Sequence, residues 1–171
     1  MRRSSITRFF SLFTLLFALA LLSACGFHLR GSGADKVQLP PTYIAGNAGP
    51  LKQEVQHYLA VAQAPVVDDQ KNAQLVITLQ DEEISRRVLS VDARGRADEY
   101  EVDYAAGYSA TRPDGKVVVA PETLTQQRSY TYNQAEVLAK NQEQERLVQD
   151  MRRDVVRRMM LRVQAKLKQG P

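Results

Sequence analysis

The only cysteine of the sequence stands in a setting that points to covalent modification. Cys25 follows Leu22, Ser23 and Ala24, so small residues precede the thiol where an apolar run stops. This pattern is a lipobox, in which the thiol receives a diacylglyceride before the chain is cleaved on its N-terminal side. We therefore predict that Cys25 is a lipid attachment point. The alternative is a buried structural cysteine.

The segment before Cys25 has the pattern of an export signal. Three arginines lie in its first eight residues, and the apolar run from Phe9 to Leu22 is 14 residues long. A permanent membrane span needs about 20 apolar residues, so we expect this segment to be removed as a signal peptide. Gly26 stands where an inner-membrane retention signal places Asp. The protein is therefore expected on the outer membrane, lipid-anchored on its periplasmic side.

Removal of the signal changes the electrostatic character of the chain. The full 171 residues carry a formal charge of +4, but the signal holds three arginines and no acids. The remaining 147 residues hold 20 basic and 19 acidic side chains, a net charge of +1. The high pI therefore gives no support for nucleic-acid binding. A chain of this length suits one domain, and it has no cysteine pair for a disulfide in the periplasm.

Positive charge is concentrated near the C-terminus. Residues 25–134 hold 11 basic and 14 acidic residues, whereas residues 135–171 hold 9 and 5. Two interpretations stay open, a solvated helix face and a contact with an anionic surface or ligand.

The first half of the mature chain predicts a short strand, a helix and a long strand. The short strand covers Thr42 to Ala45, and Pro50 is well placed as a first helical residue. Apolar residues then recur at helical spacing until the helix ends before Pro65. The long strand covers Leu75 to Val91, and its charged middle, residues 81–83, indicates a bend or an exposed edge.

The next strand has the clearest alternation in the protein. Its even-numbered positions predict a core face: Tyr100, Val102, Tyr104, Ala106, Tyr108 and Ala110. Its odd-numbered positions predict a wet face: Glu99, Glu101, Asp103, Gly107, Ser109 and Thr111. A turn at Pro113-Asp114-Gly115 leads into another strand, in which Pro121 indicates a bulge or an edge.

A long C-terminal helix is predicted to follow, with Asn133 as its cap. Its apolar stripe is formed by Leu138, Leu147, Met151, Val155, Met159 and Val163. Arginines occupy much of the remaining circumference: Arg152, Arg153, Arg157, Arg158 and Arg162.

These elements predict an α+β fold. It is a two-layer sandwich with two helices packed on one face of a mainly antiparallel four-stranded sheet, whose other face stays polar. We predict a signal peptide over residues 1–24, the acylated cysteine and a flexible tether over 25–40, and a single domain over 41–168.

The sequence offers few groups for catalysis or metal binding. Of the two histidines, His28 lies in the tether, and His57 has only Glu54 at metal-ligand spacing, so it is expected on a helix surface. We find no nucleophile elbow, phosphate loop or dinucleotide fingerprint. The acidic residues 81–83 alternate between strand faces and cannot act together on one bond. We predict that the protein is not an enzyme and holds no metal or cofactor.

Four segments together carry a family pattern. The most specific is Cys25-Gly26-Phe27-His28-Leu29-Arg30-Gly31, directly after the lipobox. The weaker ones are Gly49-Pro50-Leu51, Ala97-Asp98-Glu99-Tyr100 and Leu138-Ala139-Lys140-Asn141-Gln142-Glu143-Gln144-Glu145. Over essentially the whole mature chain, the sequence resembles the lipopolysaccharide-assembly lipoprotein family LptE.

The resemblance implies a fold of two helices on a four-stranded sheet, in agreement with the pattern above. It also implies a function. Members of this family plug the β-barrel of the partner LptD, help it assemble, and contact lipopolysaccharide during transport to the outer leaflet. A large barrel has a polar, water-filled interior, so a plug is expected to carry a polar surface such as the wet face of the alternating strand.

The resemblance further implies where lipopolysaccharide is contacted. This ligand is anionic through phosphates and sugar acids, which arginine matches with paired donors. The implied positions are the loop between the second and third strands and the Leu-Ala-Lys segment, which here offer Arg94, Arg96 and Lys140. For the two loop arginines, the alternative of ordinary solvated turn residues stays open.

Two other functions compete with this hypothesis. One is a lipoprotein scaffold of another outer-membrane assembly machine, and the other is a periplasmic envelope enzyme. Copurification with a large β-barrel would distinguish the leading hypothesis from the scaffold of another machine.

Overall fold

The computed structural model describes residues 37–46, 49–132 and 137–169, with the backbone alone over 137–141. These residues belong to one compact unit, Val37–Pro171. Several sequence-based predictions lie outside the described residues: the signal peptide, Cys25, His28, most of the tether, the Asn133 cap and the side chains of Leu138 and Lys140.

The order of elements agrees with the prediction. The strands are β1 (Thr42–Ala45), β2 (Leu75–Val91), β3 (Ala97–Thr111) and β4 (Val117–Thr131), and the helices are α2 (Pro50–Val61), α3 (Val137–Gln169) and the short 3-10 helix η1 (Gln70–Asn72). Pro50 opens α2 as expected. Within the described residues, neither long helix is apolar enough to cross a membrane.

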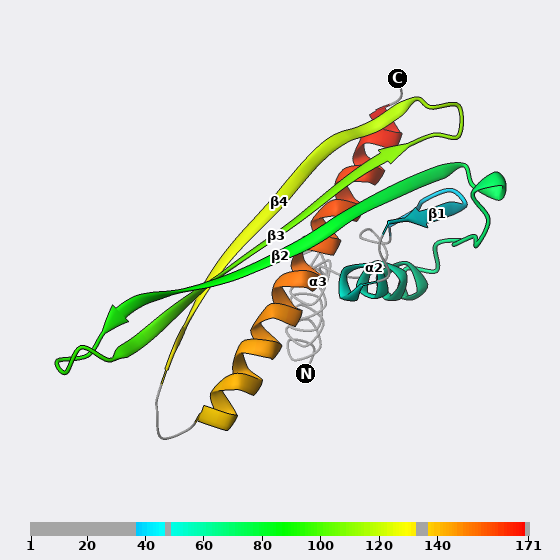
Figure 1. Cartoon of the computed structure of the whole chain (residues 1–171). Coiled ribbons are helices and arrows are strands. Elements are labelled where there is room, and N and C mark those ends of the chain that lie inside the picture. The colour runs from blue at the N-terminus through cyan, green and yellow to red at the C-terminus, as the bar shows by residue number, and fades with distance from the viewer. Residues whose placement is uncertain (1–36, 47–48, 133–136, 170–171) are drawn as a thin grey trace, which may run out of the picture. The chain divides into compact units, whose positions relative to one another are not determined.

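The four strands form one mixed sheet in the order β1-β2-β3-β4. β2, β3 and β4 are joined by tight turns and therefore pair antiparallel. β1 pairs parallel to β2, because the chain passes through α2 between them and returns in the same direction. Figure 1 shows the three long strands side by side, with both helices on the same side of them.

The charged middle of β2 combines the two features predicted for it. β1 covers only Leu75 to Thr78, so within the described residues the rest of β2 is a sheet edge. A bulge interrupts its pairing with β3 between Leu79 and Glu82. At this bulge the Gln80 side chain fills the space that a Cβ on Gly107 would need, with Oε1 only 2.1 Å from that position. Only glycine fits there without a shift of the neighbouring side chain.

Pro121 also lies at an irregularity. It is in β4, the other edge strand, where the register with β3 shifts between the pairs Tyr108–Glu122 and Ala110–Val119. Proline has no N–H to donate, and an edge or a bulge is where a sheet tolerates it. Both parts of the prediction for this residue are confirmed.

The core lies between the helices and one face of the sheet. On β3, the even-numbered residues from Val102 to Ala110 are at most 1% exposed, as the alternation predicts. Opposite them, α3 contributes Met151, Val155, Met159 and Val163, each 0% exposed, and α2 contributes Leu51, Val55 and Leu59. Leu147 is only half-buried, so the predicted stripe is confirmed most fully in the second half of α3.

Two polar clusters join α3 to the sheet beside the apolar stripe. In the first, Tyr104 donates its hydroxyl proton to Glu82 Oε2 at 2.7 Å, and Arg152 pairs with both carboxylate oxygens of Glu82 at 2.8 and 2.9 Å. In the second, Tyr108 donates to Glu122, which pairs with Arg162 at 3.1 Å. Burial, and then the hydrogen bond to the carboxylate, raises the pKa of both tyrosines well above the usual value. Both hydroxyls therefore remain donors.

Arg152 is largely buried where α3 meets the sheet. Its spacing placed it on the arginine-rich circumference outside the apolar stripe, for which a solvated face and an anionic contact both stayed open, yet its side chain is only 12% exposed and its partner Glu82 only 13%. The bulge in β2 turns Glu82 toward the helix layer, where it pairs in register with the buried Ala106. Neither the bulge nor the pairing is visible in helical periodicity.

This pair leads to a prediction about stability. Arg152→Met leaves the Glu82 carboxylate largely buried without its cation, which is expected to destabilise the fold by about 3 to 5 kcal/mol. Adding Glu82→Gln should restore part of the loss, because the neutral amide still accepts the Tyr104 proton. Urea unfolding followed by circular dichroism measures both changes.

The matched control is Arg153→Met. Arg153 pairs with Asp150 on the same helix, but both side chains are more than half exposed, so its loss should be nearly neutral. Equal destabilisation by Arg152→Met and Arg153→Met would contradict the structural role of the buried pair.

Candidate functional site

The sheet face that points away from the helices is mostly polar, with Ala105 near its centre and Val76 toward one end as apolar members. Residues directly opposite one another in neighbouring strands project to the same face. The odd-numbered residues of β3 therefore share this face with their partners in β2 and β4. We call it the polar sheet face: Glu83, Ser85, Arg87, Glu99, Glu101, Asp103, Ser109, Thr111, Thr123, Thr125, Gln127, Ser129 and Thr131. The predicted wet face of β3 is thus confirmed apart from Gly107, which is buried beside Gln80, and it continues onto both neighbouring strands.

Cross-strand contacts pair part of the charges of this face, which holds four carboxylates and one arginine. Arg87 donates through Nε to Glu101 Oε1 at 2.7 Å and lies 3.9 Å from Asp103 Oδ2. Gln127 donates to the other oxygen of Asp103 at 2.6 Å. The surface is hollowed here by about 280 Å³ between Glu83, Ser85 and Thr125. Hydroxyls, amides and paired charges of this kind favour contact with water or with another polar surface.

The loop between β2 and β3, residues 92–96, is held by one carboxylate. Asp92 Oδ1 accepts hydrogen bonds from the backbone N–H groups of Arg94 and Arg96 at 2.8 and 3.0 Å. Its Oδ2 pairs with the Arg96 guanidinium at 2.7 Å. The hydrogen bonds from Arg96, and to a smaller extent the one from Arg94, hold the pKa of the Asp92 carboxyl below its usual value. Gly95 has a φ of +75°, a left-handed conformation that favours glycine.

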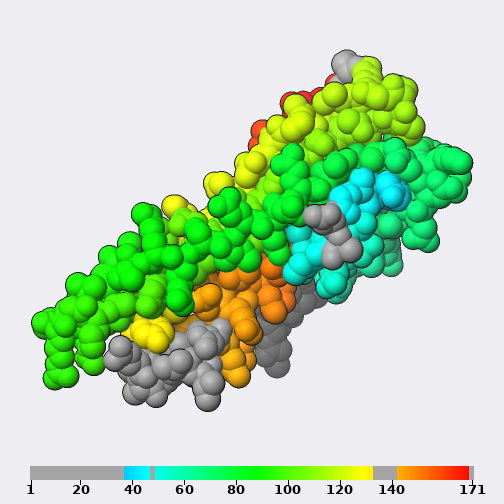
Figure 2. All heavy atoms as spheres, in the orientation of Figure 1, coloured from blue at the N-terminus to red at the C-terminus, as the bar shows by residue number. Residues whose placement is uncertain are grey.

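The loop therefore separates the two arginines that the sequence analysis treated alike. Arg96 uses its guanidinium within the loop, on Asp92. Arg94 contributes its backbone N–H to the turn, and its exposed side chain makes no salt bridge within the part of the chain described. In Figure 2 the loop belongs to the green tip at the left of the view. Of the two, Arg94 is the side chain available to a ligand.

Lys140 lies in the first turn of α3. The start of α3 lies at the same end of the sheet as this loop (Figure 1). The backbone supports this placement, because Tyr132 at the end of β4 donates to Asp98 O, at the beginning of β3, at 2.7 Å. The side chain of Lys140 lies outside the described residues. Its contact with a ligand stays a prediction.

An arginine that the sequence analysis did not single out lies near this end. The Arg86 guanidinium is 4.4 Å from the ring centroid of Tyr100 and donates to Gln144 Oε1 at 2.9 Å. Tyr130 also donates to this oxygen, at 2.8 Å, and its ring stacks on Tyr100. Tyr132 meets Tyr100 edge to face, with 5.1 Å between ring centroids. The cluster links β2, β3, β4 and α3.

The sequence contains part of the evidence for this cluster, but it does not show that the residues meet. Tyr100 and Gln144 fall in two of the segments that carry the family pattern. Nothing in the sequence says that Arg86 lies between them, because the three residues meet only through the register of β2 on β3 and the docking of α3.

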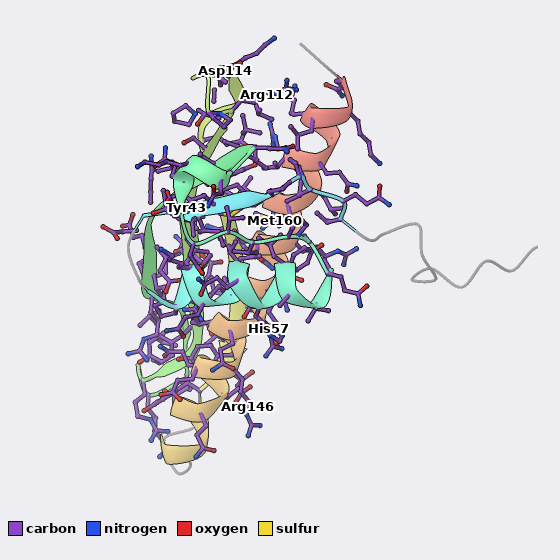
Figure 3. The ribbon with its side chains drawn as sticks, turned by 90° about the vertical axis from the view of Figure 1, so that its right-hand side faces the viewer. Tyr43, His57, Arg112, Asp114, Arg146 and Met160 are labelled. Atoms are coloured by element: carbon purple, nitrogen blue, oxygen red, sulfur yellow. The ribbon has the colours of Figure 1, made fainter. Side chains whose placement is uncertain are left out.

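Neither of the sequence's other candidates for metal binding or catalysis, His57 and the acidic residues 81–83, lies in a metal site among the residues that the structure describes. His57 is exposed on α2, as predicted, and Figure 3 shows it on the outside of that helix. No group of three or more His, Cys, Asp or Glu side chains in the described ranges is placed to hold a metal ion.

Comparison with known proteins places the chain in a family. The LptE family model, described as lipopolysaccharide-assembly, matches residues 35–163. The LPS-assembly lipoprotein LptE of Photorhabdus laumondii subsp. laumondii is 32% identical over 151 residues, which cover 86% of this chain and 82% of that protein.

Solved structures share the fold. The solution structure of an uncharacterized lipoprotein B from Nitrosomonas europaea is 26% identical, with a TM-score of 0.69, and the match covers 85% of this chain and 94% of that one. The crystal structure of the rare lipoprotein B from Shewanella oneidensis is also 26% identical, with a TM-score of 0.64 over 78% of this chain and 97% of that one. With the family model matching most of its length, the chain belongs to the LptE lipopolysaccharide-assembly family.

Proposed function

We propose that this chain is a lipid-anchored outer-membrane subunit that plugs and helps to assemble a large β-barrel, LptD, and contacts lipopolysaccharide on its way to the outer leaflet. It catalyses no reaction in this role. The observation that carries the proposal is the polar sheet face. A protein enclosed in a water-filled barrel has to present a surface of hydroxyls, amides and charged groups to a polar wall.

The free edge of β2 supports a protein partner. Past Thr78 this edge has no strand beside it among the described residues, so its backbone groups are open to pairing. It also exposes large apolar side chains, each between 44% and 59% accessible: Ile84, Val88, Leu89 and Val91. An apolar strip on an open strand edge is typical of a protein contact. We assign it to the barrel partner, with the polar sheet face beside it.

The lipopolysaccharide contact is assigned to the β2–β3 loop end. Arg94 presents an exposed guanidinium without a salt bridge among the described residues, and Lys140 begins α3 at the same end. Arg96 acts through Asp92 by holding the loop that carries Arg94. Arginine and lysine here face phosphates and sugar acids, with arginine supplying paired donors.

The barrel assignment is tested by copurification. Affinity-tagged full-length chain is expected to recover one large β-barrel protein from solubilised envelopes. Thr125→Arg, which places a long charged side chain in the centre of the polar sheet face, should reduce that recovery at least severalfold. Arg157→Glu, an exposed change on α3, is the control and should not.

Recovery of a different assembly machine would favour the scaffold hypothesis instead. Equal recovery with Thr125→Arg and the native chain would reject the polar sheet face as the contact surface.

The proposed lipopolysaccharide contact gives Arg94 and Arg96 different roles, which substitutions can distinguish. Arg94→Glu combined with Lys140→Glu should weaken lipopolysaccharide binding while leaving the circular-dichroism spectrum unchanged. Binding by the native chain should also weaken as salt rises, because the Debye length falls from about 10 Å at 0.1 M to about 3 Å at 1 M. Arg96→Glu sets a second carboxylate beside Asp92, so its effect should appear in the loop as faster amide exchange at Arg94. A folded Arg94→Glu, Lys140→Glu variant that binds like the native chain would reject this site.

The lipid anchor is tested at Cys25. Cys25→Ser is expected to accumulate as an unprocessed precursor, because the diacylglyceride has to be on the thiol before cleavage. Metabolic labelling with a radioactive fatty acid should mark the native chain only. Label on the serine variant would show that the lipid is attached elsewhere.

A further inference from the structure

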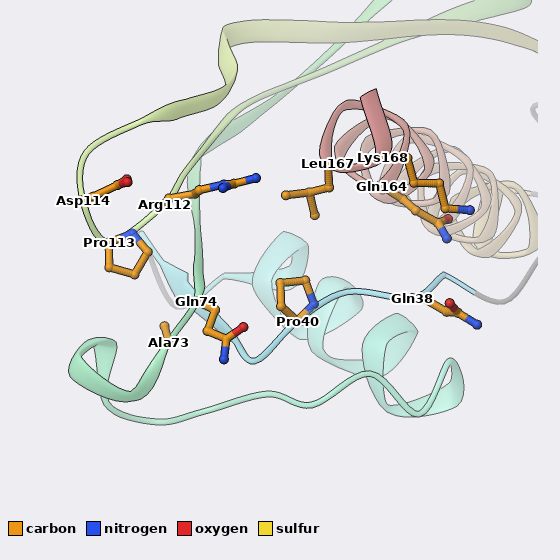
Figure 4. A pocket seen from close by; sticks show the side chains of 10 residues that line it. All are labelled: Gln38, Pro40, Ala73, Gln74, Arg112, Pro113, Asp114, Gln164, Leu167 and Lys168. Atoms are coloured by element: carbon orange, nitrogen blue, oxygen red, sulfur yellow. The ribbon is translucent and has the colours of Figure 1, made fainter. Parts of the chain in front are cut away.

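A hollow of about 670 Å³ lies at the end of the sheet opposite the β2–β3 loop. It lies between the β3–β4 turn, the last turns of α3 and the segments just before β1 and β2. Ten residues line it: Gln38, Pro40, Ala73, Gln74, Arg112, Pro113, Asp114, Gln164, Leu167 and Lys168. Figure 4 shows Arg112 and Leu167 extending toward one another across it, with Pro40 and Gln74 below them. None of the functions proposed above uses this hollow.

The hollow and its surroundings are basic. Arg112 and Lys168 line it, and a smaller neighbouring hollow that shares Arg112 adds Lys116 and Lys166. Within the described residues none of these four side chains forms a salt bridge. The one carboxylate of the lining, Asp114, accepts the Lys116 backbone N–H at 2.9 Å and so shapes the turn.

Helix stabilisation explains only part of this charge. Lys166 and Lys168 lie in the last turn of α3, where cations interact favourably with the helix carbonyls. Arg112 has no such role, because it follows β3 and enters the hollow from the sheet side. Figure 3 shows Arg112 and Asp114 at the end where α3 finishes. A half-buried guanidinium without a carboxylate partner calls for an anion.

The remaining lining specifies the anion further. Amide groups of Gln38, Gln74 and Gln164 offer donors and acceptors, while Pro40 and Leu167 give apolar walls. Arginine matches phosphate with paired donors. The lining therefore fits a phosphate ester attached to a short carbon skeleton with hydroxyl or ester oxygens, which describes a phospholipid headgroup.

The short sequence distance between this hollow's lining and Cys25 indicates which headgroups the hollow would meet. Gln38 lines it and comes 13 residues after Cys25. A fully extended chain of that length spans at most about 45 Å. The phosphates held within this reach are those of the leaflet that carries the lipid anchor.

We propose that this hollow binds phosphorylated headgroups of phospholipids in the leaflet of the lipid anchor, so that the α3 C-terminal end of the domain faces the membrane surface. The proposal rests on the proposed anchor at Cys25. In the proposed orientation, the β2–β3 loop lies at the other end of the sheet and points away from that leaflet.

The binding is tested without a membrane first. The mature full chain in nonionic detergent carries an environment-sensitive fluorophore on Asn72→Cys, an exposed residue beside the lining and the only free thiol once Cys25 is acylated. Titration with dihexanoyl phosphatidylglycerol should change its fluorescence saturably. Each basic side chain near an anionic lipid contributes a factor of about five to affinity, so Arg112→Glu with Lys168→Glu should weaken binding at least about thirtyfold. Arg157→Glu, an exposed change on α3 outside the lining of the hollow, is the control and should bind like the native chain.

Three outcomes would overturn the proposal in this experiment: no saturable response, equal affinity of the Arg112→Glu, Lys168→Glu chain, or an equal response to inorganic phosphate, which would show a simple anion site. If the Glu variant does not fold, Arg112→Gln with Lys168→Gln removes the same charges without reversing them and should also weaken binding.

The orientation is tested in nanodiscs that contain phosphatidylglycerol with a quencher on its headgroup. A fluorophore on Asn72→Cys should be quenched more strongly than one on Ala93→Cys in the β2–β3 loop, and Arg112→Glu with Lys168→Glu should remove the difference. Equal quenching at the two positions in the native chain would overturn the orientation. If Cys25 carries no lipid anchor, the result is different, because the nanodiscs then capture neither labelled chain. The titration in detergent still decides whether the hollow binds the headgroup.

Discussion

Strand β3 has to present opposite chemistry on its two faces, and the rest of the structure depends on this constraint. Its even-numbered side chains are at most 1% exposed from Val102 to Ala110 and form the floor of the core. Its odd-numbered side chains form the centre line of the polar sheet face. Because the period of a strand is two, a slip of one residue would exchange the faces and bury carboxylates. The register on both neighbours is therefore strongly specified.

Helix α3 meets this sheet through an apolar stripe and through charges that lie beside it. The stripe supplies the area removed from water, which dominates the free energy of docking. The Arg152–Glu82 pair supplies position, since a bidentate pair tolerates little rotation or sliding of the helix. The basic character of α3 thus has more than one origin, because Arg152 and Arg162 serve the sheet and Arg157 stays exposed.

The two ends of the sheet differ in how they use cations. At the β2–β3 end, Arg96 and Arg86 are held by Asp92 and by the tyrosine and Gln144 cluster, which leaves Arg94 projecting from an ordered loop. At the other end, Arg112 and three lysines stand around hollows with Asp114 as the one carboxylate. A domain anchored near one end and contacting its ligand at the other would span the path between them. The long antiparallel strands provide that span.

Sequence alone determined what depends on local patterns. The alternation of β3, the proline and glycine of its turn and the helical spacing in α3 each encode geometry within a few residues, and the element order, the core face and the polar face all follow from them. The lipobox is likewise a local pattern, so the lipid anchor at Cys25 is a prediction from sequence, and this residue lies outside the described part of the chain. Only the tertiary structure decided which charges meet. The bulge that turns Glu82 toward Arg152, the placing of Arg86 between Tyr100 and Gln144, and the hollow that joins Gln38 to Arg112 all bring together residues distant in the chain. Their pairing is set by strand register and helix docking, which no short stretch of sequence records.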